Sequence, residues 1–275
     1  MKNIKLLFAI LLIVTLTSCS ITEKLLINEN GTGKFAYEID GSKMISMMGS
    51  AFKDDEKETK KKKKKNKDNE ITRDSKDIDS TFTFKEIFAS KKDSIAKLTP
   101  EEQEKIKRME KFSVHMVMNE EKGIMNYSMF TDFNTIQELQ NVMSPLESMQ
   151  TLSPKGQTGG FAMAPTGVEE KSATQFFYDG KTFKKSVAKT EKKKEEIKSD
   201  EISEEEAAAE KMKQSMEMIY DQSNFKVVYQ FPKAVKKVSI ENALYSDDRK
   251  TITIEYPLKE YMESPEKLNF EVTFE

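Results

Sequence analysis

Cysteine, histidine and tryptophan are nearly missing from the chain, and their scarcity excludes several kinds of site. Among 275 residues there are one cysteine, one histidine and no tryptophan. A single cysteine cannot close a disulfide within the chain, and a zinc site takes several His or Cys ligands. The sequence also lacks the Gly-x-Ser-x-Gly motif of hydrolases and the glycine-rich loops that cradle phosphates. We therefore expect no catalytic residues, no metal and no cofactor.

Long apolar runs and a surplus of basic residues are lacking too. The unbroken apolar run Leu6–Val14 is too short to span a bilayer, which takes about 20 residues. The formal net charge is −2, from 45 basic and 47 acidic residues. A nucleic-acid-binding protein would carry a basic domain or stripe. The sequence therefore predicts neither a membrane-spanning helix nor a nucleic-acid partner.

The single cysteine, Cys19, closes an export signal. Lys2 and Lys5 form a basic start, an apolar run follows, and small residues precede the cysteine. These are the three parts of a secretory signal peptide. We predict that residues 1–18 are cleaved off and that residues 19–275 form a single ectodomain. A chance cysteine near an ordinary cleavage site is the alternative.

The run Leu16-Thr17-Ser18-Cys19 resembles the bacterial lipobox. The resemblance implies that cleavage falls before Cys19, that its thiol carries a diacylglyceryl group, and that the new amino terminus is open to acylation. Two or more acyl chains hold a protein stably on a membrane, at about 0.8 kcal/mol per buried CH₂. Ser20 stands where an aspartate is associated with inner-membrane retention. We therefore expect a lipid-anchored protein of the cell envelope, on the outer membrane in a cell that has one.

Alternation of apolar and polar residues predicts strands along much of the mature chain. The clearest runs are Phe225–Phe231 and Leu268–Phe274, and such alternation is typical of antiparallel strands with one solvated face. Asn30-Gly31 and Asp179-Gly180 predict hairpin turns. We expect an α+β fold, with an antiparallel sheet of about eight strands and three to five helices on one of its faces.

Three polar segments interrupt this pattern and are predicted to be flexible insertions. They cover residues 53–79, 153–172 and 189–202. The first contains Lys60–Lys65, and its few apolar residues leave little to bury. A lysine run can bind anionic lipid headgroups. We interpret this one as a solvated loop, because acidic neighbours nearly balance its charge.

Two segments of the mature chain together resemble a family. One is the hairpin sequence Glu29–Phe35, and the other is Tyr229–Lys233 followed by Thr251–Ile254. They resemble uncharacterised bacterial lipoproteins and, more distantly, LppM-type lipoproteins. That group pairs a glycine-containing hairpin near the anchor with a later strand–Pro–strand segment. The resemblance implies an ectodomain that contains both helices and strands, with the lipid-binding helix-grip folds as a candidate relation, and no established catalytic residues.

His115 and the methionines are the remaining candidates for chemistry. His115 lies on the opposite side of its predicted strand from Val114 and Met116, so we interpret it as a partly exposed strand residue. Thioethers can bind Cu(I) in exported proteins, and the chain has 16 methionines. They recur at helix or strand spacing among other apolar residues, as in Met44–Met48. We therefore interpret them as core packing.

Taken together, these features predict a non-enzymatic, membrane-anchored envelope lipoprotein that binds a lipid, an envelope polymer or a partner protein. Two alternatives remain open. The first is an envelope hydrolase or metal-binding enzyme with an unrecognised site, which would require titratable side chains to converge in a cleft. The second is a structural subunit of an envelope complex that uses an exposed apolar patch.

Overall fold

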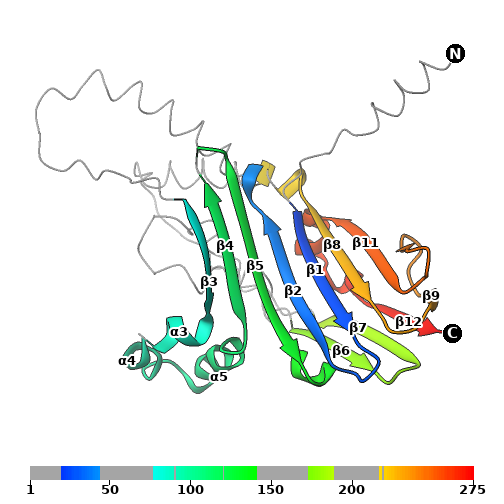
Figure 1. Ribbon diagram of the computed structural model, residues 1–275, viewed down its shortest axis with the longest axis horizontal. Coiled ribbons are helices and arrows are strands. Elements are labelled where there is room, and N and C mark those ends of the chain that lie inside the picture. The colour runs from blue at the N-terminus through cyan, green and yellow to red at the C-terminus, as the bar shows by residue number, and fades with distance from the viewer. Residues whose placement is uncertain are drawn as a thin grey trace, which may run out of the picture.

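The structure is a computed structural model, and it describes seven stretches of the chain. These are residues 20–43, 77–89, 91–119, 121–140, 173–188, 217–218 and 220–275. Within them the chain forms twelve strands, arranged in two sheets, and a few short helices (Figure 1). Cys19 and the preceding signal, and residues 53–76, 153–172 and 189–202 of the expected insertions, lie outside the described residues.

The larger sheet has eight strands in the order β10-β11-β8-β1-β2-β5-β4-β3. Its strands are β1 (Ser20–Ile27), β2 (Gly33–Asp40), β3 (Ile78–Thr83), β4 (Ser113–Asn119), β5 (Ile124–Phe133), β8 (Asn224–Gln230), β10 (Leu244–Tyr245) and β11 (Thr251–Pro257). β1 and β8 run parallel, and every other neighbouring pair in this sheet is antiparallel. The strand that follows Cys19 therefore lies inside the sheet, hydrogen-bonded on both sides.

The smaller sheet has four antiparallel strands in the order β6-β7-β12-β9. They are β6 (Ala173–Tyr178), β7 (Thr182–Ala188), β9 (Val235–Val238) and β12 (Phe270–Phe274). This sheet lies behind one half of the larger sheet in the view of Figure 1. Aromatic side chains join the two layers, with ring centroids 5.8 Å apart for Phe35 and Phe176 and 5.4 Å apart for Phe183 and Tyr229. Part of the described core thus lies between the two sheets, and buried residues of the short helices, such as Phe84 and Leu139, extend it.

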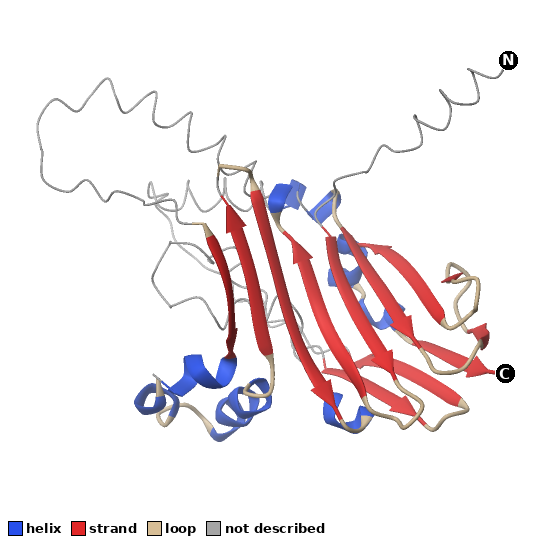
Figure 2. Ribbon diagram, viewed as in Figure 1, coloured by secondary structure: helices blue, strands red, loops and turns tan. Residues whose placement is uncertain are grey.

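The other face of the larger sheet is polar, which confirms the prediction of a solvated face. In Figure 2 the described helices and the smaller sheet all lie away from it. Ion pairs join neighbouring strands there: Lys24 Nζ lies 2.7 Å from Glu38 Oε2, and Lys34 Nζ lies 3.6 Å from Asp132 Oδ1. Inward residues of the same strands, such as Phe35, are fully buried. The alternation in the sequence therefore assigned the two faces correctly.

The predicted fold class was right only in part. The described chain is mostly β, and its larger sheet is mixed because β1 pairs in parallel with β8. A second sheet occupies the place expected for helices. Period-two alternation shows which side chains of a strand turn inward, but it does not show which strands become neighbours. The hairpin β6–β7 therefore looks the same in sequence whether it extends the first sheet or builds a second.

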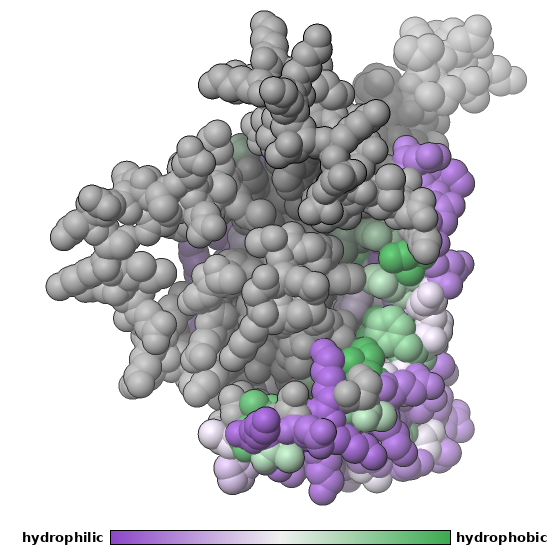
Figure 3. All heavy atoms as spheres, turned by 90° about the vertical axis from the view of Figure 1, so that its left-hand side faces the viewer, coloured by the Kyte–Doolittle hydropathy of each residue, from purple (hydrophilic) through white to green (hydrophobic). Residues whose placement is uncertain are grey.

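The described helices are short and lie mostly at the ends of strands. They are α3 (Phe84–Ala89), α4 (Lys92–Ile95), α5 (Pro100–Met109), η1 (Ile136–Leu139), α8 (Leu258–Glu263) and η2 (Pro265–Leu268). α3, α4 and α5 gather beyond one end of β3 and β4 (Figure 2). In the side view of Figure 3 the described surface at the bottom is mostly hydrophilic, with small hydrophobic patches.

The first predicted insertion, residues 53–79, ends earlier than expected, because Ile78 and Asp79 belong to β3.

Candidate functional site

A buried acidic residue interrupts the apolar inner face of β1. Ile21, Glu23, Leu25 and Ile27 all point inward, and Glu23 is only 1% exposed. A carboxylate is costly to bury unless it is paired and hydrogen-bonded. Glu23 therefore requires a cation and hydrogen-bond donors close to its carboxylate.

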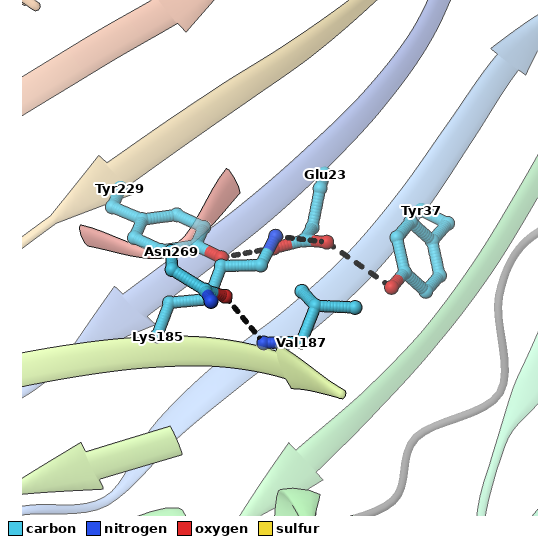
Figure 4. A network of polar contacts seen from close by, with 6 residues as sticks. All are labelled: Glu23, Tyr37, Lys185, Val187, Tyr229 and Asn269. Atoms are coloured by element: carbon cyan, nitrogen blue, oxygen red, sulfur yellow. Dashed lines mark hydrogen bonds and ion pairs between the residues drawn. The ribbon is translucent and has the colours of Figure 1, made fainter. Parts of the chain in front are cut away.

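The cation that meets Glu23 comes from the other sheet. Lys185 on β7 places Nζ 2.7 Å from Oε1 and 2.9 Å from Oε2 of Glu23 (Figure 4). Its side chain is 1% exposed and that of Glu23 2%. Burial lowers the pKa of Lys185, while the neighbouring Glu23 opposes that shift. The two residues form an ion pair that joins the sheets across the core.

Two tyrosine hydroxyls complete the shell around the carboxylate. Tyr37, directly opposite Glu23 on β2, donates to Oε2 at 3.1 Å, and Tyr229 on β8 donates to Oε1. Figure 4 shows both hydroxyls turned toward Glu23. Burial, and then the charge of Glu23, raise the pKa of both tyrosines well above 10.0. Both hydroxyls therefore stay protonated at neutral pH and remain available as donors.

Aromatic rings enclose this network. Tyr229 has the rings of four phenylalanines within 6.4 Å of its own, measured between centroids, and these are Phe176, Phe183, Phe231 and Phe270. The Lys185 ammonium lies 5.6 Å from the centroid of Phe225 and 5.9 Å from that of Tyr229. Aromatic rings from both sheets thus line the surroundings of the ion pair. Such a buried network is suited to holding two sheets in register, and a substrate would find neither Glu23 nor Lys185 exposed.

A second polar contact holds β7, the strand of the smaller sheet that carries Lys185. The backbone N–H of Val187 on β7 donates to Oδ1 of Asn269 at 2.6 Å (Figure 4). Asn269 directly precedes β12, the neighbour of β7 in its sheet. β7 is therefore held by polar contacts both across the core and within its own layer.

Two tyrosines of the core provide a matched test of this network. The Tyr256 hydroxyl is buried and has no hydrogen-bond partner among the described residues, and burial and then Glu260 raise its pKa to about 12. We expect Tyr229→Phe to lower the free energy of unfolding by about 1.5–3 kcal/mol, because it removes a hydrogen bond to a charged group. Tyr256→Phe should leave stability unchanged or raise it slightly. Urea denaturation of both variants measures the difference, and equal losses would refute the assigned role of Tyr229.

The residues singled out from the sequence do not join this network. His115 lies on the outer face of β4, where Nε2 is 3.0 Å from Asp79 Oδ1 and its side chain is 43% exposed, as expected for a strand residue. Met125 and Met129 are buried in the core, as predicted for packing residues, but Met218 is 50% exposed, so the prediction holds only for some of the described methionines. Met44–Met48 and Lys60–Lys65 lie outside the described residues. Within the described ranges, no cluster of His, Cys, Asp or Glu is arranged to hold a metal ion.

Glu23 and Lys185 were missed by the sequence analysis, although the sequence carries a signal for them. Each takes an inward position in an alternating strand: Glu23 between Ile21 and Leu25, and Lys185 between Phe183 and Val187. Opposite charges at two inward positions suggest a buried pair, because a single buried charge is rarely tolerated. Only the arrangement of the two sheets shows that these positions face each other.

Cys19 stands directly before this framework. Ser20, the next residue, begins β1 and is paired with Asp40 on β2 and with Asn224 on β8. In the part of the chain that the structure describes, no helix has the length and hydrophobicity needed to cross a bilayer.

Comparison with known proteins adds no family to these observations: no family model, curated protein or solved structure matches the chain significantly.

Proposed function

We propose that the protein is a non-enzymatic lipoprotein of the cell envelope. In this proposal residues 1–18 are removed, Cys19 carries the lipid, and the β-rich body is held at the membrane by its first residue. The observation that carries the proposal is the lipobox-like run Leu16–Cys19 behind a short apolar segment. The direct continuation of Cys19 into the paired strand β1 supports it, because folded structure then begins just past the expected cleavage site.

A binding role is favoured over catalysis by the position of the polar groups. The network that converges on Glu23 is sealed inside the core, with Glu23 and Lys185 at most 2% exposed. Catalysis requires reacting groups that a substrate can reach. The proposed ligand therefore binds outside this sealed network, and it is a lipid, an envelope polymer or a partner protein.

Replacement of the anchor residue tests the proposal. We expect Cys19→Ser to abolish incorporation of radiolabelled palmitate and to move the protein from the membrane fraction to the soluble fraction. Without the thiol no diacylglyceryl group can be attached, and the protein then lacks the CH₂ groups whose burial holds it on the membrane. The readouts are autoradiography and fractionation of cells that express the full chain.

Ser20→Ala is the matched control, because it changes the adjacent residue and leaves the thiol in place. That variant should be labelled and retained like the unaltered protein. Palmitate labelling that persists in Cys19→Ser would contradict the proposed anchor.

A further inference from the structure

One end of the larger sheet is defined by the residue that follows Cys19. Ser20 is in register with Asp40, and Asp40 with Asn126. On the other side, Ser20 is in register with Asn224, and Asn224 with Pro257. The start of β1, the end of β2 and the start of β8 therefore form one edge of the body, at the top of Figure 1.

The covalent geometry keeps this edge close to Cys19. Consecutive Cα atoms are about 3.8 Å apart, and one peptide bond separates Cys19 from Ser20, which is already held by two neighbouring strands. The opposite edge lies eight residues along β1, roughly 24 Å away at the usual rise of a strand. The turn between β1 and β2, which contains Glu29, lies at that far edge. Any group attached to Cys19 is thus much closer to one edge than to the other.

We propose that the edge containing Ser20 rests on the headgroup layer of a phospholipid bilayer, with the strands of the larger sheet rising away from it. This inference rests on the proposed acylation of Cys19. The turn between β4 and β5, which contains Lys122, then lies at the membrane. The β1–β2 turn points away from it, and the polar outer face of the sheet stands open to the side, where an envelope polymer or a partner protein can reach it.

The described charges at this edge are of both signs. Lys122 adjoins Glu121 in the β4–β5 turn, and Lys259 Nζ is paired with Asp221 Oδ1 at 2.9 Å. Paired and neighbouring opposite charges attract an anionic surface weakly, unlike the basic clusters that bind acidic lipids. The acyl chains and the short connection to β1 therefore set the orientation, and a zwitterionic membrane is sufficient for it.

Site-specific fluorescence quenching tests this orientation. Acylated Cys19 has no free thiol and is the only cysteine of the chain, so Lys122→Cys and Glu29→Cys each introduce a single reactive site. Both positions are exposed. Each lipidated full-length variant is labelled with the same fluorophore and reconstituted in phosphatidylcholine vesicles that contain a headgroup nitroxide, which quenches only over short distances. We expect several-fold stronger quenching at position 122 than at position 29.

The outcomes separate this inference from the proposed function. Equal quenching at the two positions, or stronger quenching at position 29, in protein whose mass shows the acyl chains would overturn the orientation and leave the anchor intact. A mass without acyl chains would overturn both. The same labels in the Cys19→Ser background should show no quenching at either position. Quenching at position 122 in that background would show that the protein binds the membrane without its anchor, and this result would also contradict the inference.

Discussion

Lys185→Met should lower the free energy of unfolding by about 3–5 kcal/mol, because it leaves a buried carboxylate without its cation. Lys185 Nζ contacts both oxygens of Glu23, and both side chains are almost completely buried. The hydroxyls of Tyr37 and Tyr229 remain as donors, but they carry no positive charge. Guanidinium chloride denaturation, followed by circular dichroism, measures the loss.

The neighbouring residue of the same strand supplies the control. Lys184 turns to the outer face of β7 and pairs with Glu271 at 2.9 Å, with side chains 54% and 43% exposed. Lys184→Met should therefore cost less than about 1 kcal/mol, since exposed ion pairs contribute little. Equal losses for the two lysine variants would contradict the assigned role of the buried pair.

The double variant Glu23→Gln/Lys185→Met gives a further check on the same pair. It removes both charges and keeps a side chain that can accept hydrogen bonds from Tyr37 and Tyr229. Replacing both members of a buried pair is often close to neutral, while removal of one member is not. We therefore expect the double variant to be more stable than Lys185→Met alone. A further loss of stability would show that Lys185→Met acts through packing and not through an unpaired charge.

Gly33→Ala should be the most disruptive change in the β1–β2 hairpin, with a loss of about 3 kcal/mol from overpacking. A Cβ on Gly33 would lie far inside van der Waals contact with the backbone carbonyl oxygen of Leu26 and with the ring of Phe133. The carbonyl belongs to β1, which is hydrogen-bonded on both sides, so it has little freedom to move. Thermal and chemical unfolding of the variant measure the effect.

Gly31→Asn is the control within the same hairpin. Gly31 has a φ of +81°, and nothing lies within 4 Å of the position that its Cβ would take. Asparagine tolerates the left-handed conformation better than other side chains, so this substitution should cost no more than about 1 kcal/mol. A Gly33→Ala variant as stable as Gly31→Asn would contradict the close packing of β1 against β2.

Local features of the fold could be predicted from the sequence because they depend on neighbouring residues. The alternation in Phe225–Phe231 identified the inward side chains of β8, and Asp179-Gly180 identified the turn between β6 and β7. The parallel pairing of β1 with β8 joins segments about 200 residues apart, and no local pattern specifies it. The division into two sheets was missed for the same reason.

The contacts of the candidate site could not be predicted either, because they join distant segments of the chain. The charges of Glu23 and Lys185 could be recognised as unusual at inward positions, but 162 residues separate them. The donors Tyr37 and Tyr229 looked like ordinary inward aromatics in their strands, because tyrosine suits both an apolar core and a polar partner. Only the packing of the smaller sheet on the larger one shows that all four side chains meet.

The most direct test of the lipoprotein proposal is the mass of the amino-terminal peptide from protein extracted with detergent from its own membranes. We predict a peptide that begins at Cys19 and carries a diacylglyceryl group on the thiol. Removal of ester-linked acyl chains by mild alkali should shift its mass accordingly. A peptide that begins elsewhere, or one that contains Cys19 as a free thiol, would show that Cys19 is not the lipid anchor.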